Sequence, residues 1–129
     1  MVSINTVVDV VGALVDDSLR NNIYLVDNNK ANGSTGLGTD ALQSAVNVGD
    51  TILWTVESLE PEAYAMITGI EIDSLVDVTE GVFPGSDVIY WKGIVEQQFD
   101  TLPYKLEVTV GTRTTALVTE TDIALVQIN

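Results

Sequence analysis

The stretch NVGDTILWTV, residues Asn47–Val56, decides the expected fold. Gly49 and Asp50 form a turn signal, and apolar residues then return at every second position. That period of two is typical of a strand with one buried face. Ile52 and Trp54 fall on the same face. The stretch therefore predicts a turn that leads into an inner strand, whose Trp54 fills the space between two β-sheets.

A Gly-Asp turn before a Trp-containing strand also occurs in small copper-binding β-sandwiches. Such a site holds copper through two imidazoles and one thiolate. This chain contains no His and no Cys. A blue-copper centre is therefore excluded, and so are Cys-based zinc sites, disulfides and nucleophilic catalysis with an imidazole base.

Short strand-like runs separated by turn residues cover most of the chain. Val, Ile and Thr are frequent, and β-branched residues fit strands better than helices. About seven strands are expected: Ser3–Val11, Asn22–Asn28, Thr51–Leu59, Ala63–Asp73, Val88–Phe99, Tyr104–Thr112 and a last strand or hairpin within Thr115–Asn129. Their spacing predicts an all-β fold, an immunoglobulin-like antiparallel β-sandwich, in one domain over residues 1–129.

The segments between these strands contain clear turn signals. Asn28–Asp40 is rich in Gly, Asn, Ser and Thr and is expected to be a loop, as is Ser74–Asp87 with its Pro-Gly turn at 84–85. Gly12–Asn21 is compatible with a bend, a helical turn or a crossover, and Gly93 is a candidate bend within its strand.

The chain carries 19 acidic and 5 basic residues, a formal net charge of −14. The bases are scattered singly along the sequence: Arg20, Lys30, Lys92, Lys105 and Arg113. Binding to nucleic acid or to an anionic membrane is therefore not expected. The N-terminal region lacks the basic segment of a signal peptide, and no apolar run reaches the roughly 18 residues of a membrane helix. The expected location is the cytoplasm.

The loop Asp27–Asp40 is the strongest candidate for a metal site. Calcium is bound by hard oxygen ligands, and the loop offers several: Asp27, Asn28, Asn29, Asn32, Ser34, Thr35 and Asp40. The spacing does not match an EF-hand loop, and no bidentate Glu follows. The alternatives are a carbohydrate-binding loop and a plain connection, so no metal or cofactor is assigned.

Other candidate groups carry weaker signals. Glu71 and Asp73, two apart on an expected strand, would share a face, but a small sandwich seldom offers the cleft that paired-carboxylate glycosidases need. The Gly-rich GSTGLG (Gly33–Gly38) lacks the helix and Lys-Ser/Thr pair of a phosphate loop. Of the neighbours Tyr90 and Trp91, one is expected in the core and the other exposed or at an interface. No catalytic, cofactor-binding or metal residue is assigned.

Three segments together resemble the AidA/PixA family of bacterial inclusion-body proteins. They are NIYLVDNNKANGSTGLGTDAL (22–42) with VNVGDTILWTVESL (46–59), YWKGIVEQQF (90–99), and YKLEVTV (104–110). The matching positions are Ile23 to Val26, Gly36, Gly38, Gly49, Asp50, Ile52 and Trp54. The likeness covers about residues 22–110; the chain departs in its compressed, Pro-free N-terminal part and at its C-terminal end. The resemblance implies a soluble, cytoplasmic protein without enzymatic activity, some relatives of which accumulate as ordered inclusions.

Two terminal segments are candidates for self-association. TVVDVVGALV (6–15) and TDIALVQI (121–128) carry few charges and are strongly β-prone. If either forms a sheet edge, its free backbone groups can pair with a second copy; the alternative is that both are ordinary core strands. The first hypothesis is a non-enzymatic, self-associating structural protein, and the second is a calcium- or carbohydrate-binding module.

Overall fold

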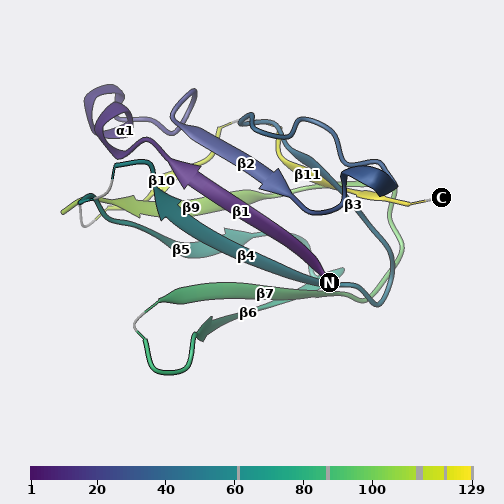
Figure 1. Cartoon of the computed structure of the whole chain (residues 1–129). Coiled ribbons are helices and arrows are strands. Elements are labelled where there is room, and N and C mark those ends of the chain that lie inside the picture. The colour runs from purple at the N-terminus through teal and green to yellow at the C-terminus, as the bar shows by residue number, and fades with distance from the viewer. Residues whose placement is uncertain (61, 87, 113–114, 121, 129) are drawn as a thin grey trace.

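A computed structural model describes residues 1–60, 62–86, 88–112, 115–120 and 122–128 (Figure 1). These residues form one α-helix, α1 (Val10–Asp16), a short 3-10 helix, η1 (Lys30–Asn32), and eleven strands. The strands are β1 (Val2–Val8), β2 (Ile23–Asp27), β3 (Gln43–Val46), β4 (Thr51–Ser58), β5 (Ala65–Glu71), β6 (Val76–Val82), β7 (Ile89–Val95), β8 (Thr101–Pro103), β9 (Lys105–Val110), β10 (Leu117–Val118) and β11 (Ala124–Gln127). Asp87, Arg113, Thr121 and Asn129, which belong to segments named above, lie outside the described residues.

The strands form three sheets, so the all-β prediction is correct. A five-stranded sheet has the order β2-β1-β4-β7-β6, and two three-stranded sheets have the orders β10-β9-β5 and β3-β11-β8. Two pairs, β1 with β4 and β11 with β3, are parallel. The expectation of purely antiparallel pairing is therefore wrong. The described residues form eleven strands instead of about seven, because several of them are too short or too polar to stand out in the sequence.

β4 fulfils what its sequence predicts. Asp50 donates its N–H to the carbonyl oxygen of Asn47 (3.1 Å), and Gly49 has a φ of +92°, which closes the turn before the strand. Within β4, Ile52 and Trp54 are fully buried. The opening stretch is thus a turn and an inner strand in the structure as well.

Trp54 links the five-stranded sheet to the rest of the molecule. Its ring meets that of Tyr104 edge-on at 5.7 Å, and its Nε1–H donates to the buried Tyr104 hydroxyl at 3.3 Å. Burial raises the pKa of Tyr104, so its phenol stays protonated at physiological pH. On the same side, Gly93 of β7 has no side chain, which leaves room for the six-membered ring of Trp54.

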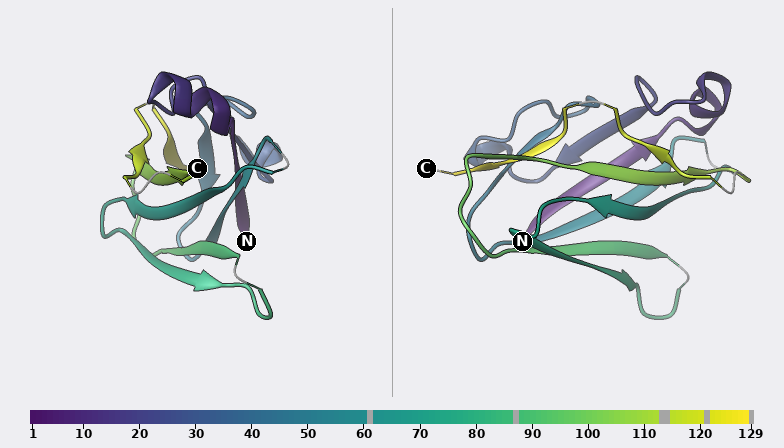
Figure 2. Two further views of the ribbon diagram at one scale, coloured as in Figure 1. Left: turned by 90° about the vertical axis from the view of Figure 1, so that its left-hand side faces the viewer. Right: turned by 180° about the vertical axis from the view of Figure 1, so that it is seen from behind.

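One hydrophobic core collects side chains from all three sheets. Its largest fully buried members include Trp54, Ile4, Leu19, Ile23, Leu25, Leu42, Ile52, Ile67, Leu106, Ile123 and Leu125. Seen end-on in Figure 2, β1 and the C-terminal strands lie on opposite sides of the molecule. The core fills the space between them.

The segment for which a bend, a helical turn or a crossover was expected contains α1. The helix begins after Asp9, whose carboxylate accepts the Gly12 N–H at 2.9 Å as an N-cap. The cap also ends β1 at Val8, three residues earlier than the sequence suggested. The apolar run over residues 3–11 is thus split between a strand and the first turn of a helix.

Glu60 supports the same helix from a distant part of the chain. Its carboxylate accepts N–H groups of Val10 (3.0 Å) and Val11 (3.2 Å). Desolvation acts to raise the pKa of Glu60, but hydrogen bonds to Asp9 and to the backbone of Val11 and Val10 outweigh it and lower that pKa to about 2. The ionised carboxylate therefore fastens the end of β4 to α1.

The segment expected to be a second loop, Ser74–Asp87, contains a strand. β6 reads VDVTEGV and alternates a buried Val76 and half-buried Val78 with exposed residues. Acidic residues and a glycine interrupt that alternation, so the sequence of β6 does not show the period of two that predicts a strand. The Pro84-Gly85 turn is present, with Ser86 N–H donating to the Phe83 carbonyl at 3.2 Å.

Candidate functional site

The sheet edges are the places where this fold leaves backbone groups free. The three sheets end in β2 and β6, in β10 and β5, and in β3 and β8. An edge strand presents unpaired N–H and C=O groups that another chain can bind unless something covers them. The covering of each edge therefore decides where a partner can attach.

The loop after β2 covers the edge of β3. Thr35 and Gln43 exchange both backbone hydrogen bonds, each at 2.9 Å. Two residues further along β3, Ala45 N–H donates to Ser34 Oγ (2.9 Å), and the Ala45 carbonyl oxygen accepts from Asn29 Nδ2 (2.6 Å). Side chains thus replace a neighbouring strand where the loop backbone does not reach.

The same loop then covers the edge of β2. Leu25 N–H donates to the carbonyl of Thr39 (2.9 Å), and Gly38 N–H donates to the carbonyl of Leu25 (2.7 Å). Gly36 and Gly38 have φ of +77° and +79°, a backbone conformation that favours glycine. The glycines of the GSTGLG stretch shape this cover, and the stretch leads into β3, not into the helix that a phosphate loop requires.

This path separates the two carboxylates of the predicted calcium loop. The loop runs back antiparallel along β2, so Asp27 lies at one end of that strand and Asp40, which accepts Asn21 N–H at 3.1 Å, lies at the other. The five residues of β2 span about 16 Å. Asp27 and Asp40 therefore cannot ligate the same ion.

Most of the remaining loop oxygens hold the loop itself. Asp27 Oδ1 accepts Asn29 N–H (2.9 Å), and Asn28 Oδ1 accepts Ser3 N–H (3.0 Å). Asp27 Oδ2 is buried and has no hydrogen-bond partner among the described residues. Nowhere in the described part of the chain do three His, Cys, Asp or Glu side chains gather in a way that suits a metal ion.

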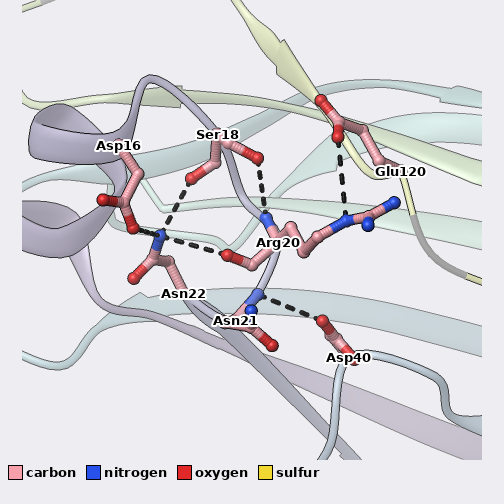
Figure 3. A network of polar contacts seen from close by, with 7 residues as sticks. All are labelled: Asp16, Ser18, Arg20, Asn21, Asn22, Asp40 and Glu120. Atoms are coloured by element: carbon pink, nitrogen blue, oxygen red, sulfur yellow. Dashed lines mark hydrogen bonds and ion pairs between the residues drawn. The ribbon is translucent and has the colours of Figure 1, made fainter.

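Asp40 belongs to a polar network around the turn between α1 and β2 (Figure 3). Asn22 Nδ2 donates to Asp16 Oδ2 (2.8 Å) and to two backbone carbonyls of the turn. Arg20 Nε approaches Glu120 Oε2 at 3.9 Å, with both side chains more than half exposed. An exposed pair at this distance contributes little to stability. The network fastens the turn to its neighbours.

The other paired groups are not brought into a site. β5 ends at Glu71, so Asp73 lies in the following turn, where its Oδ1 accepts Leu75 N–H (3.1 Å). The expected shared strand face of these two acids is therefore absent. Trp91 packs toward the core, whereas Tyr90 lies against Phe83 with ring centroids 4.7 Å apart.

Three further edges are short, interrupted or covered. β8 has three residues, one of them Pro103, which has no N–H to offer, and β10 has two residues. β5 is broken by a register shift between Ile67 and Gly69, and the Ile67 carbonyl accepts the Trp91 Nε1–H at 3.0 Å. Bulges and short strands are common ways of blocking an edge.

β6 is the long edge that remains open. Phe83 N–H donates to Val88 O (3.0 Å), which fixes the alternation of hydrogen bonds between β6 and β7. By that alternation, the backbone groups of Val78, Glu80 and Val82 point away from β7. No described residue pairs with them, and β6 lies at the margin of the molecule in Figure 1.

The two terminal segments named from the sequence are not edges. β1 is paired on both sides, with β2 and β4, and β11 is paired with β3 and β8. The alternative that both are ordinary core strands is correct only in part: residues 6–8 and 124–127 lie in inner strands, whereas residues 10–15 of the first segment belong to α1. The open edge lies in β6, a segment whose sequence predicts a loop.

The complete fold has a counterpart among solved structures. It is similar to the crystal structure of an inclusion body protein (PixA) from Burkholderia cenocepacia J2315, with a TM-score of 0.80 and 13% sequence identity. The match covers 98% of this chain and 93% of that chain. The resemblance to inclusion-body proteins is thereby confirmed at the level of the fold.

The family follows from the sequence. The chain matches the family described as a domain of unknown function, DUF8788, over residues 1–115, and it belongs to that family. The comparison with curated proteins gave no match. In the part of the chain that the structure describes, no helix has both the length and the apolar character needed to cross a membrane.

Proposed function

We propose that this protein is a non-enzymatic structural protein that associates with copies of itself. The observation that carries the proposal is the uncovered edge of β6 in a molecule that covers, shortens or interrupts its other edges. A fold shared with a PixA inclusion body protein supports the same function. As part of the proposal, the five-stranded sheet and the sheet of β5, β9 and β10 form the two layers of an immunoglobulin-like sandwich.

The chemistry of the side chains also favours a structural role. The chain has neither His nor Cys, which removes imidazole bases and thiol nucleophiles. Two carboxylates that were candidates for a site, Asp27 and Asp40, accept backbone N–H groups of nearby turns. We infer that the loop between them protects sheet edges and needs no ion. Calorimetric titration with calcium is expected to give no binding heat; saturable heat that disappears in Asp27→Ala would contradict this role.

Association has to overcome a formal charge of −14 on each copy. Salt shortens the range of that repulsion, and a lower pH reduces the charge itself. Light scattering coupled to size-exclusion chromatography is expected to show a monomer at low ionic strength and neutral pH, and larger species as salt rises or pH falls toward 5. A monomer under all of these conditions, at concentrations up to about millimolar, would refute the proposal.

A further inference from the structure

We propose that two copies of this chain pair antiparallel along β6, Val76–Val82, about a two-fold axis at Thr79. The inference rests on the proposed self-association and names its interface. It joins the five-stranded sheets of both copies into one continuous sheet. A pairing of this kind is self-complementary, because each copy contributes the same strand.

The register follows from the groups that are free. The outward-pointing residues are Val76, Val78, Glu80 and Val82, and in an antiparallel pair such residues must face one another. With the axis at Thr79, Val78 of each copy exchanges both backbone hydrogen bonds with Glu80 of the other. Val82 N–H reaches the carbonyl of Val76, whose own N–H is already bonded to Asp73 (3.1 Å). All seven residues of β6 then have a partner.

The same register avoids direct contact between acidic residues. Asp77 stands opposite Gly81, Glu80 stands opposite Val78, and Thr79 faces its own copy. An axis at Asp77 or at Glu80 would place two carboxylates face to face, which is destabilising. An axis at Val78 would also avoid this, but it would leave Val82 without a partner. The Thr79 axis is therefore the one that combines full overlap with separated charges.

Apolar packing favours the same pairing. Val82 is 52% exposed in the single copy, and Val76 is 2% exposed. In the single copy Val82 faces Ile89 of β7 on one side only, and pairing with the second copy would cover its other side. The exposed Phe83 and Val88 at the end of the β6–β7 hairpin extend the apolar surface beyond this pair.

A cysteine placed on the axis tests the register directly, because the chain has no cysteine of its own. In a pair without mutual hydrogen bonds the two Cα atoms are about 4.5 Å apart, within the range for a disulfide. Thr79→Cys is therefore expected to form a disulfide-linked dimer under mild oxidation. Asp77→Cys is the matched control on the same exposed face: its two copies would lie four residues apart along the strands, about 13 Å, too far to link.

Two variants at Glu80 test the interface by another route. Proline is tolerated on an edge strand where its N–H faces solvent, so Glu80→Pro is expected to fold, which circular dichroism checks. It removes one hydrogen bond per copy and should raise the dissociation constant by at least about tenfold. Glu80→Gln should lower it roughly threefold at low salt, because the two Glu80 carboxylates are diagonal neighbours about 7–8 Å apart. Glu120→Gln removes the same charge away from β6 and should change it less.

The outcomes separate this interface from self-association in general. Linkage at Thr79→Cys but not at Asp77→Cys supports the register. If the wild-type chain associates while Thr79→Cys fails to link, or links no better than Asp77→Cys, the β6 register is refuted and the proposed function stands. A wild-type chain that stays monomeric in light scattering refutes both.

Discussion

The close fit between Gly93 and Trp54 makes a sharp prediction about the core. A Cβ atom on Gly93 would lie 2.9 Å from Cζ3 of Trp54 and 3.0 Å from Cγ1 of Val76. Ordinary carbon contacts need about 3.5–4.0 Å. Overpacking of this kind costs about 1–3 kcal/mol. Removing a glycine from the unfolded chain returns about 0.4–1 kcal/mol. Gly93→Ala is therefore expected to lower the free energy of unfolding by about 1–2 kcal/mol.

A double-mutant cycle tests the cause as well as the size of the loss. Trp54→Phe removes the ring atoms that lie over Gly93 but leaves the contact with Val76, so Gly93→Ala should cost less in that background, with a coupling of about 1 kcal/mol. Urea unfolding followed by far-UV circular dichroism measures all four variants without relying on Trp fluorescence. Gly69→Ala is the control, because its Cβ would meet only the movable carboxylate of Glu107. An equal loss from Gly93→Ala in both backgrounds would refute the role of the Trp54 ring in this loss.

Three further predictions concern groups that the structure pairs. Tyr104→Phe leaves the buried Trp54 Nε1–H without an acceptor and should cost about 1 kcal/mol in urea unfolding, because the lost bond is long at 3.3 Å. Glu60 has a pKa near 2 in the folded state, so its contribution is present above pH 4.5 and lost as pH falls toward 2. Glu60→Gln should thus be less stable than wild type at pH 6, with the difference shrinking through that window. Ser34→Ala should lower the free energy of unfolding by about 1–2 kcal/mol in urea, because the Ala45 N–H at the β3 edge loses its acceptor. An unchanged free energy of unfolding would contradict the role of the loop in covering this edge.

Features set by neighbouring residues were predictable from the sequence. The turn at Gly49-Asp50 and the buried face of Ile52 and Trp54 follow from spacing over a few residues, and both are present. The same reasoning failed for β6, where Asp77 and Glu80 made a strand resemble a loop. Its strand character comes from pairing with β7, which lies later in the chain.

The candidate site depended on contacts between distant segments. The oxygen-rich composition of Asp27–Asp40 suggested an ion site, but composition does not reveal that the loop runs back along β2. Its polar side chains instead form hydrogen bonds with backbone groups, as the Asn29 amide does with the Ala45 carbonyl. The signal available in the sequence was the run of glycines, which fits a segment that follows a strand edge closely.

By itself, the sequence determined the all-β character of this protein, its inner strand around Trp54, its strong negative charge and the absence of imidazole and thiol chemistry. Those properties depend on composition and on a repeat of two residues. Only the tertiary structure decided which strands are central and which are edges. It placed the apolar termini β1 and β11 inside their sheets and left the more polar β6 open. The physical reason is that an edge is defined by the absence of a neighbour, and neighbours in a sheet are chosen across the whole chain.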